Sequence, residues 1–329
     1  MNRTSLKIFI AAIFIVLNTA LPSLAKEDPL KGKVVVIIGA SSGFGKGTAL
    51  KMSKRGAHVV LAARRMNLLT DLQKQCGNDS IAVQTDISKS DEVQHLAEVT
   101  LEKFHHIDVW INDVGVGAIG RFDEIPLEDH SRMIDINLKG IIYGSHVAIK
   151  QFKKQGYGTL INLGSIDSEV PLAYQGSYSA SKAAVLSLGR VLNEELRLAK
   201  FKKIHVSTIM PWAVDTPWWD HSANYSGGTA RMGSMEGPEK VVNAMVKASI
   251  HPKEEIAVGW KARSAYHFHK MFPDLSERIS ANVAHKYQIK EAPPSPNTHG
   301  TLFTPMQSGT EIEGGVRERM KLEKSSSTK

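Results

Sequence analysis

Apolar runs alternate with amphipathic segments along the chain from Lys33 to about residue 260. The run Val34-Val35-Val36-Ile37-Ile38 is apolar throughout, as expected for a strand that helices cover on both faces. Helix-like segments with short connections separate it from six further strand candidates: His58–Ala62, Ile81–Gln84, Ile107–Ile111, Thr159–Leu163, His205–Met210 and Glu255–Val258. The pattern predicts an α/β fold, a doubly wound parallel sheet of about seven strands in one domain over residues 32–260.

The C-terminal extension, residues 261–329, departs from this pattern. Ser264 to Lys286 is consistent with an amphipathic helix. A tail that contains Gly, Pro and Ser follows from Ala292-Pro293-Pro294-Ser295-Pro296, and we expect it to be extended or disordered.

The N-terminus has the order of a secretory signal peptide. Arg3 and Lys7 precede an apolar run from Ile8 to Leu17, and Ser23-Leu24-Ala25 offers small residues for cleavage after Ala25. Ten apolar residues are short for a membrane span, which needs about 20. We therefore expect residues 1–25 to direct export to the periplasm, the ER lumen or the exterior. Because Leu6 to Ala25 is 20 residues long, an uncleaved membrane anchor is the alternative.

Composition narrows the function classes. The chain has 329 residues, a formal net charge of +8 and one cysteine, Cys76, which excludes an intrachain disulfide framework and a multi-cysteine metal site. No basic stripe interleaves with aromatic residues, so we expect no nucleic-acid partner. The histidine pairs His105-His106 and His267-x-His269 have no companion carboxylate or cysteine cluster at ligand spacing, so we expect no metal.

A glycine-rich loop joins the first strand to the first helix-like segment, Lys46 to Arg55. Glycines in such a loop permit a tight turn and let the backbone approach a pyrophosphate at a helix N-terminus. The loop therefore predicts a dinucleotide site that includes Gly39, Ser41, Ser42, Gly43, Phe44 and Gly45.

Two arginines follow the second strand, where an NAD enzyme usually places an acidic residue for the ribose 2′-hydroxyl. The chain reads Leu61-Ala62-Ala63-Arg64-Arg65, and no carboxylate appears before Asp71. Arginines at this position can bind a 2′-phosphate through charge-assisted hydrogen bonds. We therefore expect NADP(H), with NAD as the alternative cofactor.

A tyrosine, a lysine and a serine form a candidate catalytic group. Tyr178 and Lys182 are four residues apart and share one helix face. A free tyrosine has a pKa near 10, so acid–base work near neutrality needs a neighbouring positive charge such as Lys182. Ser165 ends the strand segment 13 residues before Tyr178, from where its hydroxyl can polarise a carbonyl.

Together with the loop, these residues resemble the short-chain dehydrogenase/reductase family, single-domain NAD(P)-dependent type with a Rossmann fold. The resemblance covers roughly residues 32 to 260, and Ser165, Tyr178 and Lys182 match its triad, with Asn137 matching the asparagine of its proton relay. It further implies cofactor contacts from Asp86, Asn112, Pro211, Thr216, Tyr178 and Lys182. The chain departs from the family's Asn-Asn-Ala-Gly at Asp113 and Val114, and Trp212 stands where Pro-Gly is usual.

The resemblance implies hydride transfer between the nicotinamide and a carbonyl or secondary alcohol, with Tyr178 as general acid or base. It also implies a homo-oligomer, and the helix after Tyr178 is apolar over a wide arc, at Ala184, Val185, Leu188, Val191 and Leu192. The resemblance further implies a lid over the substrate, in a segment that contains Trp212, Trp218, Trp219 and Tyr225. These aromatic residues have two interpretations: they contact an apolar substrate, or they only pack the lid onto the core. The alternative function is a catalytically idle dinucleotide-binding protein.

Overall fold

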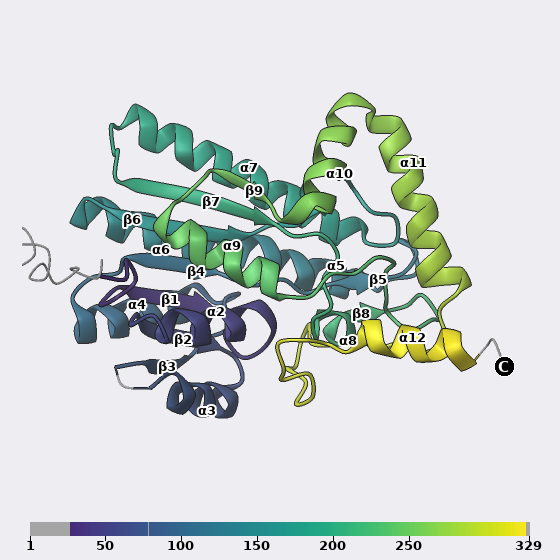
Figure 1. Ribbon diagram of the computed structural model, residues 1–329, viewed down its shortest axis with the longest axis horizontal. Coiled ribbons are helices and arrows are strands. Elements are labelled where there is room, and N and C mark those ends of the chain that lie inside the picture. The colour runs from purple at the N-terminus through teal and green to yellow at the C-terminus, as the bar shows by residue number, and fades with distance from the viewer. Residues whose placement is uncertain (1–26, 78, 327–329) are drawn as a thin grey trace, which may run out of the picture.

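Seven parallel strands form the central sheet of the protein, whose computed structural model describes residues 27–77 and 79–326. The order across the sheet is β3-β2-β1-β4-β6-β7-β9 (Figure 1). The strand bounds are β1 Val34–Ile38, β2 His58–Ala63, β3 Ile81–Gln84, β4 Val109–Asn112, β6 Gly158–Leu163, β7 Ile204–Met210 and β9 Glu255–Ala257. The predicted doubly wound α/β fold is confirmed. The predicted signal or anchor segment, residues 1–25, lies outside the described residues.

Helices cover both faces of the sheet. Side chains alternate along β1, so Val35 and Ile37 pack on one side while Val34, Val36 and Ile38 pack on the other. The first side is covered by α2 (Gly43–Ser53), α3 (Met66–Cys76) and α9 (Glu239–Ile250). The second side is covered by α4 (Ser90–Phe104), α6 (Gly140–Gln155) and α7 (Gly176–Leu198). Burial on both faces explains why β1 is apolar at every position.

The strand order reverses between β1 and β4. From β1 the chain adds β2 and β3 on one side, and from β4 it adds β6, β7 and β9 on the other. In open α/β sheets the crevice at the carboxyl ends of the strands at this switch point is where ligands bind. The short elements at that end are β5 (Ala118–Ile119), α5 (Leu127–Ile134), the π-helix η1 (Asp135–Lys139), the 3-10 helix η2 (Ile166–Ser168), α8 (Trp218–His221) and β8 (Ala223–Asn224). β5 and β8 pair in parallel as a separate small sheet.

Several predicted boundaries shift by one to three residues. The helix after the glycine loop was predicted from Lys46 but begins at Gly43, within the loop itself. β4 begins at Val109, two residues later than predicted. These shifts bring the loop's backbone N–H groups into the first turn of α2, where they are free of intrahelical partners.

The C-terminal extension differs most from the prediction. The single helix expected over Ser264 to Lys286 is two helices, α10 (Gly259–Met271) and α11 (Pro273–Ala284), followed by the π-helix η3 (His285–Lys290). Pro273 causes the break because it has no N–H to donate and is tolerated only in the first turn of a helix.

The tail predicted to be extended or disordered is a defined segment that lies against the rest of the protein and ends in α12 (Val316–Ser326). Figure 1 shows it as the yellow loop that runs beside the N-terminal end of α2. Its order is explained by long-range hydrogen bonds described below.

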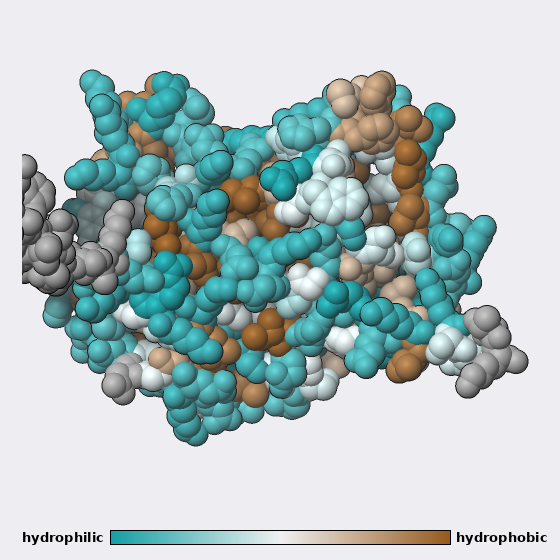
Figure 2. All heavy atoms as spheres, viewed as in Figure 1, coloured by the Kyte–Doolittle hydropathy of each residue, from teal (hydrophilic) through white to brown (hydrophobic). Residues whose placement is uncertain are grey.

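An exposed apolar row follows α11 and the turn before it. Figure 2 shows hydrophobic side chains gathered along this helix at the edge of the molecule, and the exposed members of the row are Met271, Phe272, Leu275, Ile279 and Val283. Ile279 and Val283 also line the main cavity, so α11 stands at its mouth. Within residues 27–77 and 79–326, no helix combines the length and hydropathy needed to cross a bilayer.

Candidate active site

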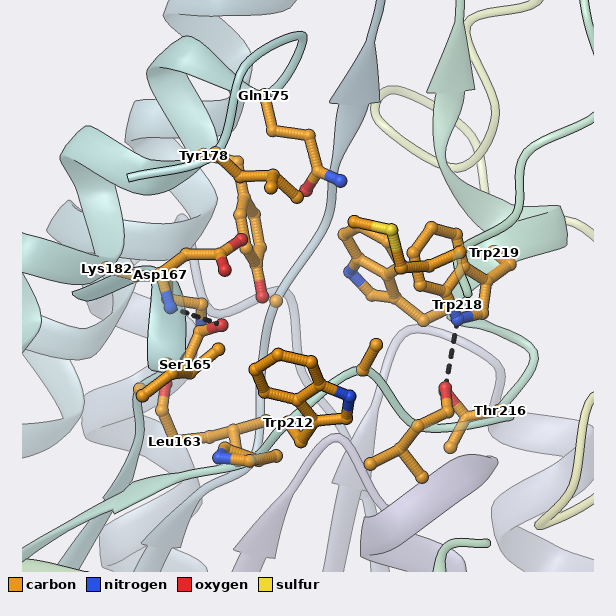
Figure 3. A pocket seen from close by; sticks show the side chains of 18 of the residues that line it. Leu163, Ser165, Asp167, Gln175, Tyr178, Lys182, Trp212, Thr216, Trp218 and Trp219 are labelled. Atoms are coloured by element: carbon orange, nitrogen blue, oxygen red, sulfur yellow. Dashed lines mark hydrogen bonds between the residues drawn. The ribbon is translucent and has the colours of Figure 1, made fainter. Parts of the chain in front are cut away.

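Ser165, Tyr178 and Lys182 converge at the carboxyl end of β6. Ser165 follows the strand and caps η2, where its Oγ accepts a hydrogen bond from the backbone N–H of Asp167 at 3.1 Å. Tyr178 and Lys182 lie one turn apart near the start of α7, with the Lys182 Nζ 5.7 Å from the centre of the Tyr178 ring. Figure 3 shows these three side chains and Asp167 on one side of the cavity.

Lys182 is fully buried and held at two points. Its Nζ donates to the carbonyl of Leu163 at 2.7 Å and to that of Val114 at 3.1 Å. Two neutral carbonyls fix the ammonium, and its charge acts on the carboxyls of Asp113 and Asp167.

Opposing influences act on the ionisation of Tyr178 and Lys182. Burial raises the pKa of the Tyr178 phenol, the Asp167 carboxylate raises it further, and a hydrogen bond with Ser165 lowers it. Burial lowers the pKa of Lys182 to about 8, while the Asp113 and Asp167 carboxylates act in the opposite direction. Tyr178 therefore holds its proton at neutral pH, which suits a proton donor.

Two half-buried carboxyls near Lys182 extend the group. Burial raises the pKa of both Asp113 and Asp167 to about 7, and in each case the charge of Lys182 acts against the rise. The sequence showed Asp113 only as a departure from the family pattern, and Asp167 was missed. Its position two residues after Ser165, in the turn between a strand and the catalytic helix, was the signal available.

Replacing Asp113 with asparagine should move the alkaline limb of kcat/KM for reduction to lower pH. Above pH 7 the Asp113 carboxylate is mostly ionised and supports the Lys182 ammonium. Without that charge the pKa of Lys182 falls below about 8, by about one unit for a close opposite charge, and the cation is lost sooner as pH rises. A pH profile of kcat/KM tests this, with the exposed Asp123→Asn as control. An unmoved limb would contradict the coupling.

Asn137 lies in η1 and is fully buried. Its side-chain amide donates to the carbonyl of Val116 at 2.8 Å and to Ser181 Oγ at 3.2 Å, and its Oδ1 accepts from the backbone N–H of Val116 at 2.9 Å. A π-helical turn inside a helix often marks a functional site. The structure thus places Asn137 beside α7, with its side chain holding the chain segment that also contacts Lys182.

The side chain of Asn112, a residue predicted to contact the cofactor, is hydrogen-bonded within the sheet. Its side chain accepts from Trp110 Nε1 at 2.8 Å and donates to Asn162 Oδ1 at 2.8 Å. The residue is fully buried and lines neither of the two cavities at the site. Its side-chain role in the structure is to join β4 to β6.

The glycine loop makes contacts that side chains would block. Gly39 has φ +97°, and a Cβ there would lie 1.9 Å from the carbonyl oxygen of Asp113. A Cβ on Gly45 would lie 2.4 Å from the carbonyl oxygen of Gly39. The close approach places the N-terminal end of α2 beside a cavity lined by Gly39, Ser42, Gly43 and Phe44, where the N–H of Gly43 donates to the carbonyl of Glu311 at 2.9 Å.

Arg64 and Arg65 have different surroundings. Arg65 is buried and all its N–H groups are engaged: by the hydroxyls of Ser41 and Ser42, and by the carbonyls of Met306 and Ser308. Arg64 donates to the carbonyl of Thr301 at 2.7 Å and, at 3.5 Å, to that of Leu302. Arg65 therefore braces the loop, and Arg64 is the arginine with donors to spare.

Asp86 lies in the same region and is paired with Arg132, a residue that the sequence analysis missed. Arg132 Nη2 is 3.0 Å from Asp86 Oδ2, and Asp86 also accepts from the hydroxyl and N–H of Ser88. These bonds and the charge of Arg132 lower the pKa of the Asp86 carboxyl, although burial, the largest single influence, acts to raise it. The negative charge of Asp86 is thus compensated by Arg132. Asp86 lines the smaller of the two cavities at the site, which is described below.

The larger cavity, about 530 Å³, extends from the glycine loop to Tyr178 and α11. Pro211, Thr216 and the predicted lid residues Trp212, Trp218 and Trp219 line it, but Tyr225 does not. Tyr225 donates to Asp129 at 2.5 Å and packs in a cluster with Ile125 and Met133. Trp218 packs against Tyr178 with ring centres 5.2 Å apart, and Figure 3 shows it facing Tyr178 across the cavity.

Apolar side chains from the C-terminal helices complete the wall, which explains a role for residues 261–329 that the sequence did not reveal. The members from α10, α11 and η3 include Phe268, Ile279, Val283 and Tyr287. Aromatic and aliphatic groups therefore join Ser165, Asp167 and Gln175 in the wall of this cavity.

A smaller cavity of about 160 Å³ lies on the other side of the loop, between the ends of β1, β2 and β4. Arg64, Arg65, Asp86 and Thr301 are among its lining residues, and it shares Gly39, Ser42, Asp113 and Gly115 with the larger one. The two hollows thus form one elongated site over a glycine cradle and a helix N-terminus, which fits an adenine dinucleotide.

Comparison with known proteins agrees with this geometry. The family model described as short chain dehydrogenase matches residues 33–225, more than half of the chain. The protein therefore belongs to the short-chain dehydrogenase family, and the predicted resemblance is confirmed.

A relative from Bacillus subtilis (strain 168), the uncharacterized oxidoreductase YxnA, is 33% identical over 292 residues, which cover 87% of this chain and 82% of that protein. The structure resembles a short chain dehydrogenase/reductase from Burkholderia phymatum in complex with NAD, with TM-score 0.67, 25% identity and coverage of 75% and 96% of the two chains. It also resembles the 3-ketoacyl-(acyl-carrier-protein) reductase from Brucella melitensis complexed with NADH, with TM-score 0.60, 28% identity and coverage of 69% and 96%.

Proposed function

We propose that the protein transfers a hydride between NADP(H) and the carbonyl or secondary alcohol carbon of an apolar substrate. The observation that carries this proposal is the position of Tyr178, Lys182 and Ser165 on the wall of the cavity that begins at the glycine loop. The neighbouring structures that contain NAD and NADH support a nicotinamide cofactor. The position of Arg64 beside the smaller cavity supports the preference for NADP(H).

When bound, the nicotinamide would donate or accept the hydride. Ser165 would hold the substrate oxygen near the Tyr178 hydroxyl, and Tyr178 would give its proton to the oxygen as negative charge develops during reduction. The Lys182 ammonium, fixed by the carbonyls of Leu163 and Val114, would stabilise the phenolate that remains.

The cavity wall supports an apolar substrate. Trp212, Trp218, Phe268 and Ile279 surround the space beside Tyr178, and burying apolar substrate surface there contributes roughly 25 cal/mol per Å². The substrate carbonyl would meet the polar group at one end, with the rest of the molecule directed toward α11.

Turnover with a panel of carbonyl compounds tests the proposal. NADPH oxidation should be measured with aldehydes, ketones and steroids, and NADPH binding should be measured separately by fluorescence. We expect oxidation to proceed with at least one apolar carbonyl compound. Binding of NADPH without turnover across the panel would favour a catalytically idle protein.

We further propose that copies of the chain associate through α6 and α7. Ile142, Val191 and Leu198 are exposed on these helices, whereas Val185 from the predicted arc is buried in the core. Sedimentation at micromolar concentration should give a species larger than the 36.1 kDa chain, and Val191→Glu should shift it toward that mass. Leu127→Glu, at an exposed position of α5, is the matched control. A wild-type chain that sediments only as a monomer would contradict the proposal.

A further inference from the structure

A segment near the C-terminus crosses the site between two buried anchors. Leu302 is fully buried in a small cluster with Met133 and Ala223, and Val316 is buried against Trp219. Between them, residues 303–315, which we term the strap, are exposed or half-buried. The strap is thus held firmly at its ends and buries little of its own side-chain surface.

Backbone carbonyls hold the strap in place. Arg65 donates to the carbonyls of Met306 and Ser308 at 3.1 and 3.2 Å, and Lys46 donates to that of Thr310 at 3.0 Å. The backbone N–H of Gly43, in the glycine loop, donates to the carbonyl of Glu311 at 2.9 Å. Arg65 lines the smaller cavity, and Lys46 lies outside both cavities and also pairs with the Glu311 carboxylate of the strap, Nζ to Oε2 at 3.3 Å.

The strap occupies one donor of the glycine loop, the N–H of Gly43, through the carbonyl of Glu311, and leaves space open on the adenosine side. Pro305 and Met306 line the smaller cavity opposite Arg64 and Asp86, so an open space remains beneath them. Thr301, just before the Leu302 anchor, lines both cavities. A hollow therefore continues under this part of the chain from the adenosine side of the site to the catalytic side.

We propose that the strap closes over the adenosine half of a bound adenine dinucleotide and opens to let it exchange. This inference rests on the proposed cofactor binding. The smaller cavity would hold this half of the dinucleotide. Its wall includes the glycine loop, Arg64 and Asp86, and the strap adds Pro305 and Met306. Because few buried side chains hold the strap, opening it requires breaking its carbonyl hydrogen bonds and the ion pair between Lys46 and Glu311.

Gly309 itself lines neither cavity and offers a way to open the strap, although His221, the residue on which a new Cβ would press, lines both. Gly309 has φ +66°, and a Cβ there would lie 2.3 Å from His221 Nε2, which itself contacts the carbonyl of Ser308. Gly309→Ala should therefore displace the strap from His221 and Arg65. Gly227→Ala is the matched control, since Gly227 has φ +74° and a Cβ there meets nothing within 4 Å.

Release of NADPH from the full chain should be followed by stopped-flow fluorescence. We expect Gly309→Ala to release NADPH about tenfold faster than the wild type, as the loss of two or three hydrogen bonds predicts, and Gly227→Ala to release it at the wild-type rate. In the wild type, hydrogen exchange in peptides covering residues 303–315 should slow when NADPH is added.

Three results would overturn the inference. The wild-type protein could bind NADPH while Gly309→Ala leaves the release rate unchanged and NADPH leaves hydrogen exchange in the strap unchanged. In that case the strap is a fixed wall, and the proposed function stands. If Gly309→Ala binds NADPH more tightly, the strap competes with the dinucleotide. If the wild type binds no NADPH, the proposed function fails together with this inference.

Discussion

Replacing Tyr178 with phenylalanine should lower kcat by at least about 100-fold, the usual contribution of general acid–base catalysis. The proposed function makes this hydroxyl the group that exchanges a proton with the substrate oxygen, and phenylalanine has no such proton. The ring remains, so its packing against Trp218 and the shape of the cavity are kept. Steady-state kinetics with a carbonyl compound found active in the panel provides the measurement.

Cofactor binding distinguishes lost chemistry from lost structure. The Kd for NADPH, measured by fluorescence, should change little in Tyr178→Phe, because the adenosine half of the site is unaffected. Tyr157→Phe, at a residue near the start of β6 that lines neither cavity, is the matched control and should retain wild-type turnover. Wild-type kcat in Tyr178→Phe would exclude the proposed role of Tyr178.

The sheet and the convergence of Ser165, Tyr178 and Lys182 were predictable because their signals are local. A strand covered on both faces is apolar at every position, as β1 is, and no tertiary information is needed to find it. The spacing of Tyr178 and Lys182 places both on one helix face, and residues that follow parallel strands meet at one edge of the sheet. Each of these inferences needs only the residues of one segment and the geometry of its class of element.

The break between α10 and α11 was missed although Pro273 marks it. The apolar positions of α11 recur at helical spacing after those of α10. The hydrophobic pattern alone therefore predicts one continuous helix across Pro273. Proline at the first position of a helix is a start signal. The loss of a hydrogen-bond donor at Pro273 therefore outweighs continuity of the pattern.

The order of the strap could not be predicted from its composition. Its glycine, proline and polar residues are typical of a disordered tail, and its partners lie far away in the sequence: Arg65 is 241 residues from Met306. The strap accepts these bonds through backbone carbonyls, which every residue type provides. The amino-acid sequence of the strap therefore does not predict the backbone contacts that order it.

Asp167 shows the same limit at the catalytic end. The carboxyl belongs to no motif that the sequence matched, and its effect on Tyr178 and Lys182 arises only when η2 folds against α7. The elevated pKa of Asp167, about 7, follows from burial, a property of the assembled cavity.

The largest expected effect on cofactor preference comes from Arg64. Replacing it with alanine should weaken NADPH binding by about 10- to 100-fold and NADH binding by much less, since a hydrogen bond to a charged group contributes about 1.5–3 kcal/mol and only NADPH carries the 2′-phosphate. Arg64 borders the smaller cavity and uses few of its N–H groups on the carbonyls of Thr301 and Leu302. Kd values for both coenzymes provide the measurement.

Arg65→Ala should behave differently, although the two arginines are adjacent. Arg65 binds Ser41 and Ser42 of the glycine loop and two carbonyls of the strap, so its loss should weaken NADH and NADPH alike and lower the free energy of unfolding. Arg55→Ala, at an arginine paired with Asp28 away from both cavities, controls for the loss of a positive charge. If Arg64→Ala weakened the binding of NADH and NADPH equally, Arg64 would stabilise the fold together with Arg65. The proposed preference for NADP(H) would then have no residue to explain it.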